Sequence, residues 1–251
     1  HPRDRRQRQM CIRDSCDTKA LTVALIRGAF EYQGQKCSAA SRAYIPETVW
    51  DSIKDEYCNE VGKIRMGDPR DFSNFMSAVI DRKSFDNIVG YIDRAKEDPG
   101  CEIVTGGNYD DKTGYFIEPT TIVCKDSRYE TMSEEIFGPV LSIHIYPDDD
   151  FDRILEVCDT TSEYALTGSI FATDRRNIEK AVSALRYSAG NFYINDKPTG
   201  AVVGQQPFGG ARGSGTNDKA GSPLNLLRWV SPRSIKETFA PPHEWTYGFL
   251  N

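Results

Sequence analysis

The amino-acid sequence predicts an α/β fold: an open, mostly parallel β-sheet flanked by helices. Two observations carry this prediction. Short segments such as Val140–Tyr146 and Gly168–Thr173 are mostly apolar, as strands buried on both faces of a parallel sheet are. Segments with a helical apolar stripe, such as Arg82–Glu97, lie between the strands. Strands that alternate with helices indicate parallel pairing through right-handed crossovers.

Helices are expected where apolar residues recur at spacings of three and four and a capping or breaking residue marks an end. Asp17–Phe30 places Leu21, Ala24, Leu25 and Ala29 on one face. The same pattern predicts helices at Thr48–Val61, Arg82–Glu97, Phe151–Cys158, Arg175–Arg186 and Leu224–Val230.

Strands are expected where short apolar runs are bounded by glycine, proline or turn residues. The runs that fit are Arg42–Ile45, Glu102–Thr105, Tyr115–Val123, Val140–Tyr146, Gly168–Thr173 and Gly190–Asn195, with Ser234–Phe239 as a candidate edge strand. Pro119 interrupts the third of these, and Gly67-Asp68-Pro69 predicts a turn.

The first fifteen residues differ from the rest, because they are dense in Arg and Gln and have almost no apolar periodicity. A basic targeting arm is one interpretation, but Asp4 and Asp14 fit it poorly. We favour the other, translated read-through of a sequencing adaptor, with the biological chain starting near Cys16. We therefore expect a non-native or disordered leader at 1–15 that packs against nothing, one domain at 16–222 and a C-terminal segment at 223–251.

The composition excludes several classes of protein. The chain has 251 residues, of which 39% are hydrophobic, and this suffices for a sizeable core. The net charge of −6, with no basic stripe, argues against a nucleic-acid partner, and no apolar run is long enough to span a membrane. The seven Cys and three His contain no Cys-x-x-Cys motif, so neither a disulfide framework nor a metal site is indicated, and a reducing compartment fits best.

One stretch, Phe30–Arg42, has the features of a nucleophile segment. Gly34 allows a sharp turn, and Cys37 follows among small residues that leave room for a second molecule. Lys36 and the N–H groups freed at such a turn favour the thiolate form of Cys37. From these residues alone, a buried and inert cysteine is the commoner case.

The interpretation of Cys37 as a nucleophile is supported by three motifs that occur in this order: Gly34–Cys37, Glu134–Val140 and Gln206–Gly210. Together they resemble the aldehyde dehydrogenase superfamily, and the likeness covers nearly everything from Ser15 to Asn251. The fuller runs Phe30–Pro46 and Pro207–Lys219 are similar to one branch. That branch uses NAD to oxidise L-glutamate γ-semialdehyde, which exists as 1-pyrroline-5-carboxylate, to glutamate in proline catabolism.

The resemblance implies a role for each site residue. Cys37 would attack the aldehyde carbon, pass through a thiohemiacetal and a thioester, and contribute its backbone N–H to the oxyanion. Glu135 would accept from the nicotinamide ribose hydroxyls of NAD, and Phe137 would pack against the nicotinamide end. Without the motif, Glu134 and Glu135 could equally form a solvated acidic loop.

The resemblance also implies substrate contacts. Thr199, Gly200 and Ala201 would form an anchor loop for the α-carboxylate, with Ser38 adding a hydroxyl. Some relatives carry Ser where this chain has Ala201, although the backbone donors remain. Phe208 would wall the aliphatic chain. On spacing alone, Gly200 could mark an ordinary turn and Phe208 could be core. We expect these residues to converge at the carboxyl ends of the strands.

The resemblance places other parts of the enzyme upstream of this start: the general base, an Asn oxyanion donor and the dinucleotide-binding glycine turn. We therefore expect the isolated chain to be inactive, and the C-terminal segment to supply an oligomerisation strand to a homo-oligomer. The compartment would be the cytoplasm in a bacterium and the mitochondrial matrix in a eukaryote. Three alternatives stay open: an aldehyde dehydrogenase of another specificity, a non-catalytic assembly segment, and a cysteine acyltransferase or hydrolase.

Overall fold

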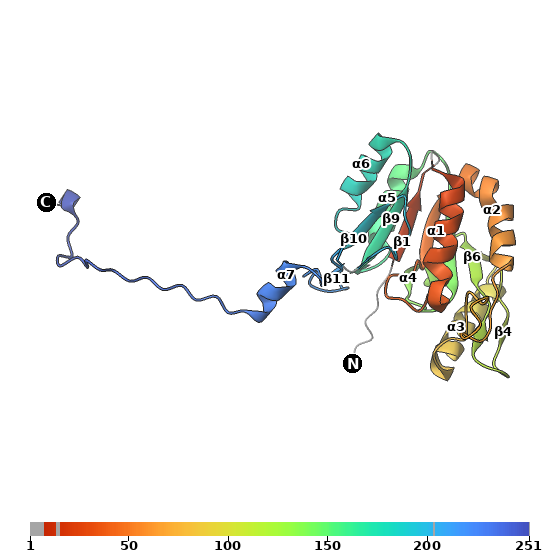
Figure 1. Cartoon of the computed structure of the whole chain (residues 1–251). Helices are drawn as coiled ribbons and strands as arrows, with labels where there is room; N and C mark the ends of the chain where they lie inside the picture. The colour runs from red at the N-terminus through yellow and green to blue at the C-terminus, as the bar shows by residue number, and fades with distance from the viewer. Residues whose placement is uncertain (1–7, 14–15, 203, 251) are drawn as a thin grey trace.

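The computed structural model describes residues 8–13, 16–202 and 204–250. A seven-stranded sheet forms the centre of the molecule, with helices on both faces (Figure 1). Its strand order is β10-β9-β1-β2-β7-β6-β3, and every neighbouring pair is parallel except β3 with β6. The predicted fold class is therefore confirmed.

The strands have these bounds: β1 Arg8–Ile12, β2 Arg42–Pro46, β3 Cys101–Thr105, β4 Tyr109–Asp110, β5 Phe116–Ile117, β6 Thr120–Cys124, β7 Val140–Tyr146, β8 Tyr164–Ala165, β9 Thr167–Phe171, β10 Asn191–Ile194 and β11 Ala211–Arg212. The helices are α1 Thr18–Phe30, α2 Glu47–Gly62, α3 Arg82–Glu97, α4 Glu130–Ser133, α5 Phe151–Thr160, α6 Arg175–Ala184 and α7 Pro223–Leu226, with 3₁₀ turns η1 Glu31–Gly34, η2 Leu227–Trp229 and η3 Gly248–Leu250. Within the described ranges, none of the helices has the length and apolar composition that crossing a bilayer requires.

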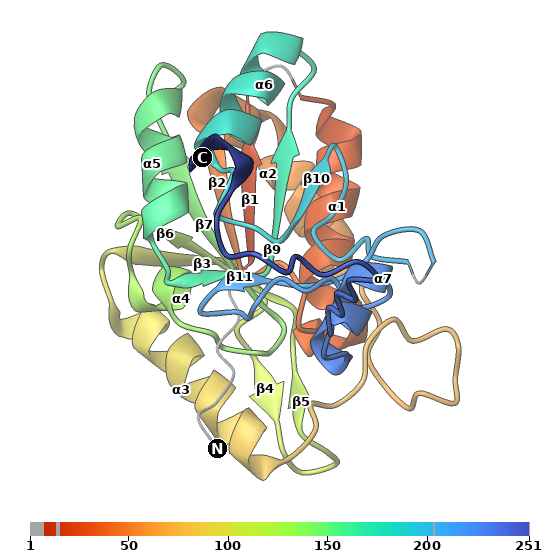
Figure 2. The same cartoon turned by 90° about the vertical axis from the view of Figure 1, so that its left-hand side faces the viewer.

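The sheet separates two apolar cores. Helices α1 and α2 cover one face, and α5 and α6 cover the other, as Figure 2 shows. Successive residues of β1 and β2 alternate between the cores: Met10 and Ala43 face the first, while Cys11 and Tyr44 face the second. This alternation is the period of two that a strand imposes.

The expected disordered leader is wrong for Arg8–Ile12, which forms β1 between β2 and β9. Met10, Cys11 and Ile12 have no exposed surface. The composition of the whole segment concealed this short apolar run, which precedes a helix as a strand in a βα unit does. Gln9 is also accommodated, because its side chain donates to Ser188 Oγ (3.0 Å) and accepts from Arg42 (2.7 Å). Residues 1–7 and 14–15 lie outside the described part.

The C-terminal segment leaves the body of the molecule after α7 (Figure 1). The predicted helix at Leu224–Val230 appears as α7 and η2. The predicted edge strand at Ser234–Phe239 is wrong for the chain by itself, since these residues carry no strand structure. The physical reason is that a strand needs a partner edge, and this segment extends away from the sheet.

His144 on β7 gives the sheet a testable pH dependence. Its Nδ1 lies 3.0 Å from the Cys124 carbonyl oxygen, and burial lowers its pKa below the usual value of about 6.5. Below that pH the unfolded chain binds a proton that the folded chain does not. The free energy of unfolding should therefore fall from pH 7.5 to 5.5, by at most about 1.4 kcal/mol per pH unit.

We expect His144→Gln to remove this part of the pH dependence in urea unfolding at the two pH values. His243→Gln is the matched control, because His243 is exposed in the C-terminal segment. An unchanged pH dependence in His144→Gln would contradict the assignment.

Candidate active site

The segment before Cys37 has an unusual backbone. After α1 ends, Tyr32, Gln33 and Gly34 have φ angles of 56°, 57° and 65°, all in the left-handed region. A Cβ on Gly34 would lie 2.2 Å from the Gly138 carbonyl oxygen and 2.8 Å from that of Ala29. Only glycine fits there. The turn predicted at Gly34 is present, and it is packed against a distant loop.

Neighbouring segments hold this turn in place. Gln33 donates from its amide nitrogen to the Ala78 carbonyl oxygen (3.1 Å), and Ile80 N–H donates to Gln35 Oε1 (2.9 Å). A left-handed backbone costs about 1–2 kcal/mol for each non-glycine residue. These hydrogen bonds therefore offset the backbone strain at Tyr32 and Gln33. Strain of this kind is typical of functional sites.

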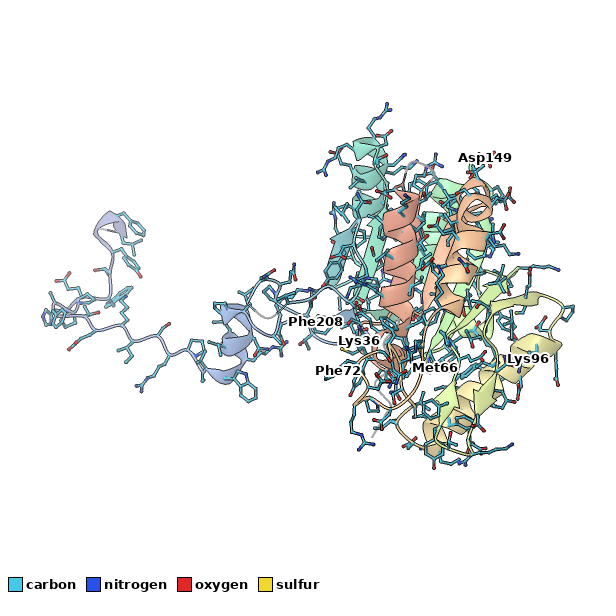
Figure 3. All side chains as sticks on the ribbon, turned by 45° about the vertical axis from the view of Figure 1, so that its right-hand side comes forward. Lys36, Met66, Phe72, Lys96, Asp149 and Phe208 are labelled. Atoms are coloured by element: carbon cyan, nitrogen blue, oxygen red, sulfur yellow. The ribbon has the colours of Figure 1, made fainter. Side chains whose placement is uncertain are left out.

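Cys37 lies at the amino ends of the parallel strands, because it follows the end of α1 and precedes the start of β2 at Arg42. Figure 3 shows Lys36 and Phe208 at the end of the molecule opposite Asp149, which follows the carboxyl end of β7. The expected placement at the carboxyl ends is therefore wrong for Cys37. An α1 helix that returns antiparallel to β1 must deliver the next loop to the amino edge. Cys37 is a free, half-buried thiol, and Ser38 beside it is also half-buried.

The loop between α4 and β7 contacts the turn formed by Tyr32, Gln33 and Gly34 directly. Gly138, whose carbonyl faces Gly34, ends a run in which Ile136 is buried and Phe137 is 42% exposed. Phe137 also has a left-handed φ of 60°, and Glu135 is half-buried. The loop that holds the two residues predicted to meet the cofactor thus packs, through Gly138, against the turn that precedes Cys37. The contact of Glu135 and Phe137 with the cofactor stays a prediction.

The anchor loop follows β10 and folds back along it. A Cβ on Gly200 would lie 3.0 Å from the Tyr193 ring and from the Asp196 carboxylate. Gly200 is half-buried, whereas Ala201 is exposed. Lys197 joins this loop to the end of α1, because its Nζ donates to both Thr199 Oγ1 (2.8 Å) and Glu31 Oε2 (3.2 Å).

Phe208 belongs to a loop fixed at the amino end of β10. Its backbone exchanges hydrogen bonds with Ala220 (2.9 and 2.8 Å), and Asn191 bonds both Pro207 and Gly209 (2.9 and 3.1 Å). The Phe208 side chain is half-buried. These bonds place Phe208 at the same sheet edge as Cys37, and its contact with substrate stays a prediction.

Sequence reasoning missed two residues that organise the site, Glu31 and Lys197. Glu31 Oε2 also accepts from Lys36 Nζ (2.9 Å), so one carboxylate joins the nucleophile segment to the anchor loop. Burial raises the pKa of Glu31, but hydrogen bonds from Lys36 and then Lys197 outweigh it, and the net shift is downward. A glutamate five residues before a lysine gives no signal by itself, since the third partner is far away in the sequence.

Comparison with known proteins gives a consistent picture. Residues 7–235 match the family model described as "Aldehyde dehydrogenase family". The chain is 58% identical over 239 residues to the mitochondrial Delta-1-pyrroline-5-carboxylate dehydrogenase of Dictyostelium discoideum, covering 95% of this chain and 43% of the relative. It is 49% identical over 240 residues to the human protein of that name, with coverage of 95% and 43%.

Solved structures agree. The Delta-pyrroline-5-carboxylate dehydrogenase of Mycobacterium tuberculosis bound with NAD is similar, with a TM-score of 0.87 and 51% identity over 98% of this chain and 45% of that chain. The 1-pyrroline-5-carboxylate dehydrogenase from Thermus with bound NAD has a TM-score of 0.78 and 32% identity over 88% of this chain and 41% of that one. The chain thus spans less than half the length of these relatives.

Proposed function

The chain belongs to the aldehyde dehydrogenase family, and from this membership we propose that it carries the nucleophile and substrate-anchor parts of an NAD-dependent L-glutamate γ-semialdehyde dehydrogenase. The observation that supports this most is the junction at Gly34. There the turn before Cys37 packs against the loop of Glu135 and Phe137. This packing supports a site in which the proposed nucleophile lies near the residues proposed to face the cofactor, as oxidation through a covalent adduct requires.

The proposed chemistry uses the residues of this chain in order. The Cys37 thiolate attacks the aldehyde carbon, and the backbone N–H of Cys37 stabilises the oxyanion of the resulting thiohemiacetal. Bound NAD would supply the acceptor for the hydride that leaves this adduct. The carbon is then a thioester on Cys37, and hydrolysis releases the acid and frees the thiol. Glu135 and Phe137 would orient the nicotinamide end.

The substrate follows from the anchor loop. Successive backbone N–H groups at Thr199, Gly200 and Ala201 suit a carboxylate, and Ser38 adds a hydroxyl close to Cys37. Phe208 would cover the methylene chain between the two ends. A short amino acid with an aldehyde at one end and an α-carboxylate at the other fits this arrangement, as the branch-level resemblance also indicates.

The C-terminal segment supports assembly into a homo-oligomer. Trp229, Phe239 and Trp245 are 81%, 89% and 88% exposed, and the segment extends away from the sheet (Figure 1). Exposed apolar side chains in such number indicate an interaction surface. The names of the Dictyostelium and human relatives include "mitochondrial", so the mitochondrion is the proposed compartment for a eukaryotic source.

Substrate oxidation tests the proposal. We define the completed enzyme as this chain joined to the rest of the polypeptide of its Dictyostelium relative. Its kcat/KM, measured by NAD reduction, should be about 10- to 100-fold higher for L-glutamate γ-semialdehyde than for propanal, because hydrogen bonds to a charged group contribute about 1.5–3 kcal/mol. No acid should form without NAD. An equal or greater kcat/KM with propanal would instead favour an aldehyde dehydrogenase of another specificity.

A further inference from the structure

One carboxylate in this structure is shared by two lysines from distant parts of the chain. Glu31 Oε2 accepts from Lys36 Nζ at 2.9 Å and from Lys197 Nζ at 3.2 Å. Lys197 Nζ also donates to Thr199 Oγ1 at 2.8 Å. The three charged side chains are half-buried, with 28%, 29% and 23% of Lys36, Glu31 and Lys197 exposed. We call Glu31, Lys36 and Lys197 the lysine clamp.

The lysine clamp connects the two ends of the proposed substrate site. Lys36 immediately precedes Cys37, and Lys197 lies two residues before Thr199, where the anchor loop begins. Glu31 stands at the start of η1, on backbone fixed by the bond of its own N–H to the Arg27 carbonyl oxygen. The carboxylate is therefore a fixed point to which both functional segments are tied.

The packing around the lysine clamp restricts movement of both the segment before Cys37 and the anchor loop. On the nucleophile side, Gly34 has no space for a Cβ beside Gly138. On the anchor side, a Cβ on Gly28 would already contact Lys197 and Pro198 at 3.6 and 3.5 Å, so the loop lies against α1. Lysine side chains are long and flexible, and they hold a fixed separation only when the ammonium groups are themselves bound. Glu31 supplies that restraint for both.

The charges of the lysine clamp act on the geometry of the site. Its two ammonium groups and one carboxylate carry one net positive charge, while the Asp196 carboxylate lies beside Gly200 in the anchor loop. Without Glu31 the positive charge would double, and the two lysines would repel each other and separate. Glu31 therefore halves the positive charge of the two lysines and prevents the two segments from moving apart.

We propose that Glu31 is a positioning residue that, through Lys36 and Lys197, fixes the separation of Cys37 from the Thr199–Ala201 loop and so selects the chain length of the substrate. This rests on the proposed function, which it deepens. The spacing between the reacting carbon and the α-carboxylate is then set by a side chain that touches neither. Amino-dicarboxylates one methylene shorter or longer than glutamate fit this spacing less well.

The test uses Glu31→Gln, which keeps the size of the side chain and removes its charge. In the parent chain, glutamate should slow alkylation of Cys37 by iodoacetamide more strongly than aspartate or 2-aminoadipate does. In Glu31→Gln, the alkylation rate without ligand should stay within about twofold, protection by glutamate should weaken about tenfold, and the preference among the three acids should disappear. Glu31→Asp should restore part of the preference.

Kinetics of the completed enzyme give a second readout. Glu31→Gln should raise KM for the semialdehyde about tenfold with less than a threefold change in kcat, and it should lower kcat/KM for propanal much less than kcat/KM for the semialdehyde. Glu60→Gln is the matched control, because Glu60 pairs with Lys63 at 2.6 Å on the exposed surface of α2. It should change none of these quantities.

The outcomes separate the two proposals. If glutamate protects the parent and Glu31→Gln equally, with the same preference for chain length, the positioning role is wrong and the proposed function stands. If glutamate does not protect the parent, the proposed function is wrong and the lysine clamp has no such role. Should Glu31→Gln fail to fold, Lys197→Gln removes only one of the two ion pairs of Glu31, the one with Lys197. It should weaken the protection of Cys37 by glutamate, while the alkylation rate without ligand stays within about twofold.

Discussion

We expect Cys37→Ala to abolish NAD reduction by the completed enzyme, with a loss of more than about 10⁴-fold in kcat, as when an enzyme loses its nucleophile. Alanine cannot form the thiohemiacetal, so no tetrahedral adduct is available from which hydride can leave. The measurement is NADH absorbance with L-glutamate γ-semialdehyde. Cofactor affinity should change little, because Glu135 and Phe137 stay in place.

Two half-buried cysteines provide matched controls for this loss. Cys58 and Cys101 are free thiols like Cys37, and burial raises the pKa of each. Cys58→Ala and Cys101→Ala should retain turnover. In the parent chain, mass spectrometry should find Cys37 alkylated faster than these two at neutral pH, since a raised pKa lowers the fraction of reactive thiolate. Turnover retained in Cys37→Ala, or uniform labelling, would show that the nucleophile is misassigned.

The second large effect is expected from Gly34→Ala. The new Cβ would meet the Gly138 carbonyl oxygen at 2.2 Å on backbone with a φ of 65°. Overpacking costs about 1–3 kcal/mol and left-handed backbone about 1–2 kcal/mol more, so we expect a loss of about 2–5 kcal/mol in the free energy of unfolding. Relief by movement of the Gly138 loop would shift Phe137 relative to the turn that precedes Cys37.

Urea unfolding and glutamate protection of Cys37 measure these two effects. Gly62→Ala is the control, since no atom lies within 4 Å of a Cβ there and Gly62 ends helix α2. It should be neutral or stabilising by up to about 1 kcal/mol. A Gly34→Ala protein that unfolds at the same urea concentration as the parent would contradict the packing described at this turn.

Local signals predicted most elements correctly. Helix α3 has its predicted bounds, Arg82–Glu97, because Asp81 caps its amino end by accepting from Ser84 N–H (2.7 Å) and Pro99 lies just beyond its last turn. The buried strand β7 was equally clear from its apolar run. In both cases the forces that define the element act within a few residues of it.

Other features depend on distant partners, and there sequence reasoning failed or was incomplete. Strand β1 was missed because only three apolar residues identify it and its partners, β2 and β9, come later in the chain. The prediction that Cys37 lies at the carboxyl ends of the strands was wrong. It followed a general rule about ligand sites and did not consider that α1 returns the chain to the amino ends. The pairing of Glu31 with Lys197 joins residues 166 positions apart, so no local pattern encodes it.

Strand β1 has a consequence for how the site is assembled. The strands on one side of it, β9 and β10, carry the anchor loop and the Phe208 loop, whereas β2 and β7 on the other side carry Cys37 and the Glu135 loop. In the sheet, only β1 lies between these two groups. Its pairing with β9, which aligns Arg8 with Thr167, can form only after most of the chain has been synthesised. Contacts so distant in sequence form late and slow the search for the native state. Cys37 and the loop of Gly200 therefore come together only when β1 pairs with β9, a strand much later in the sequence.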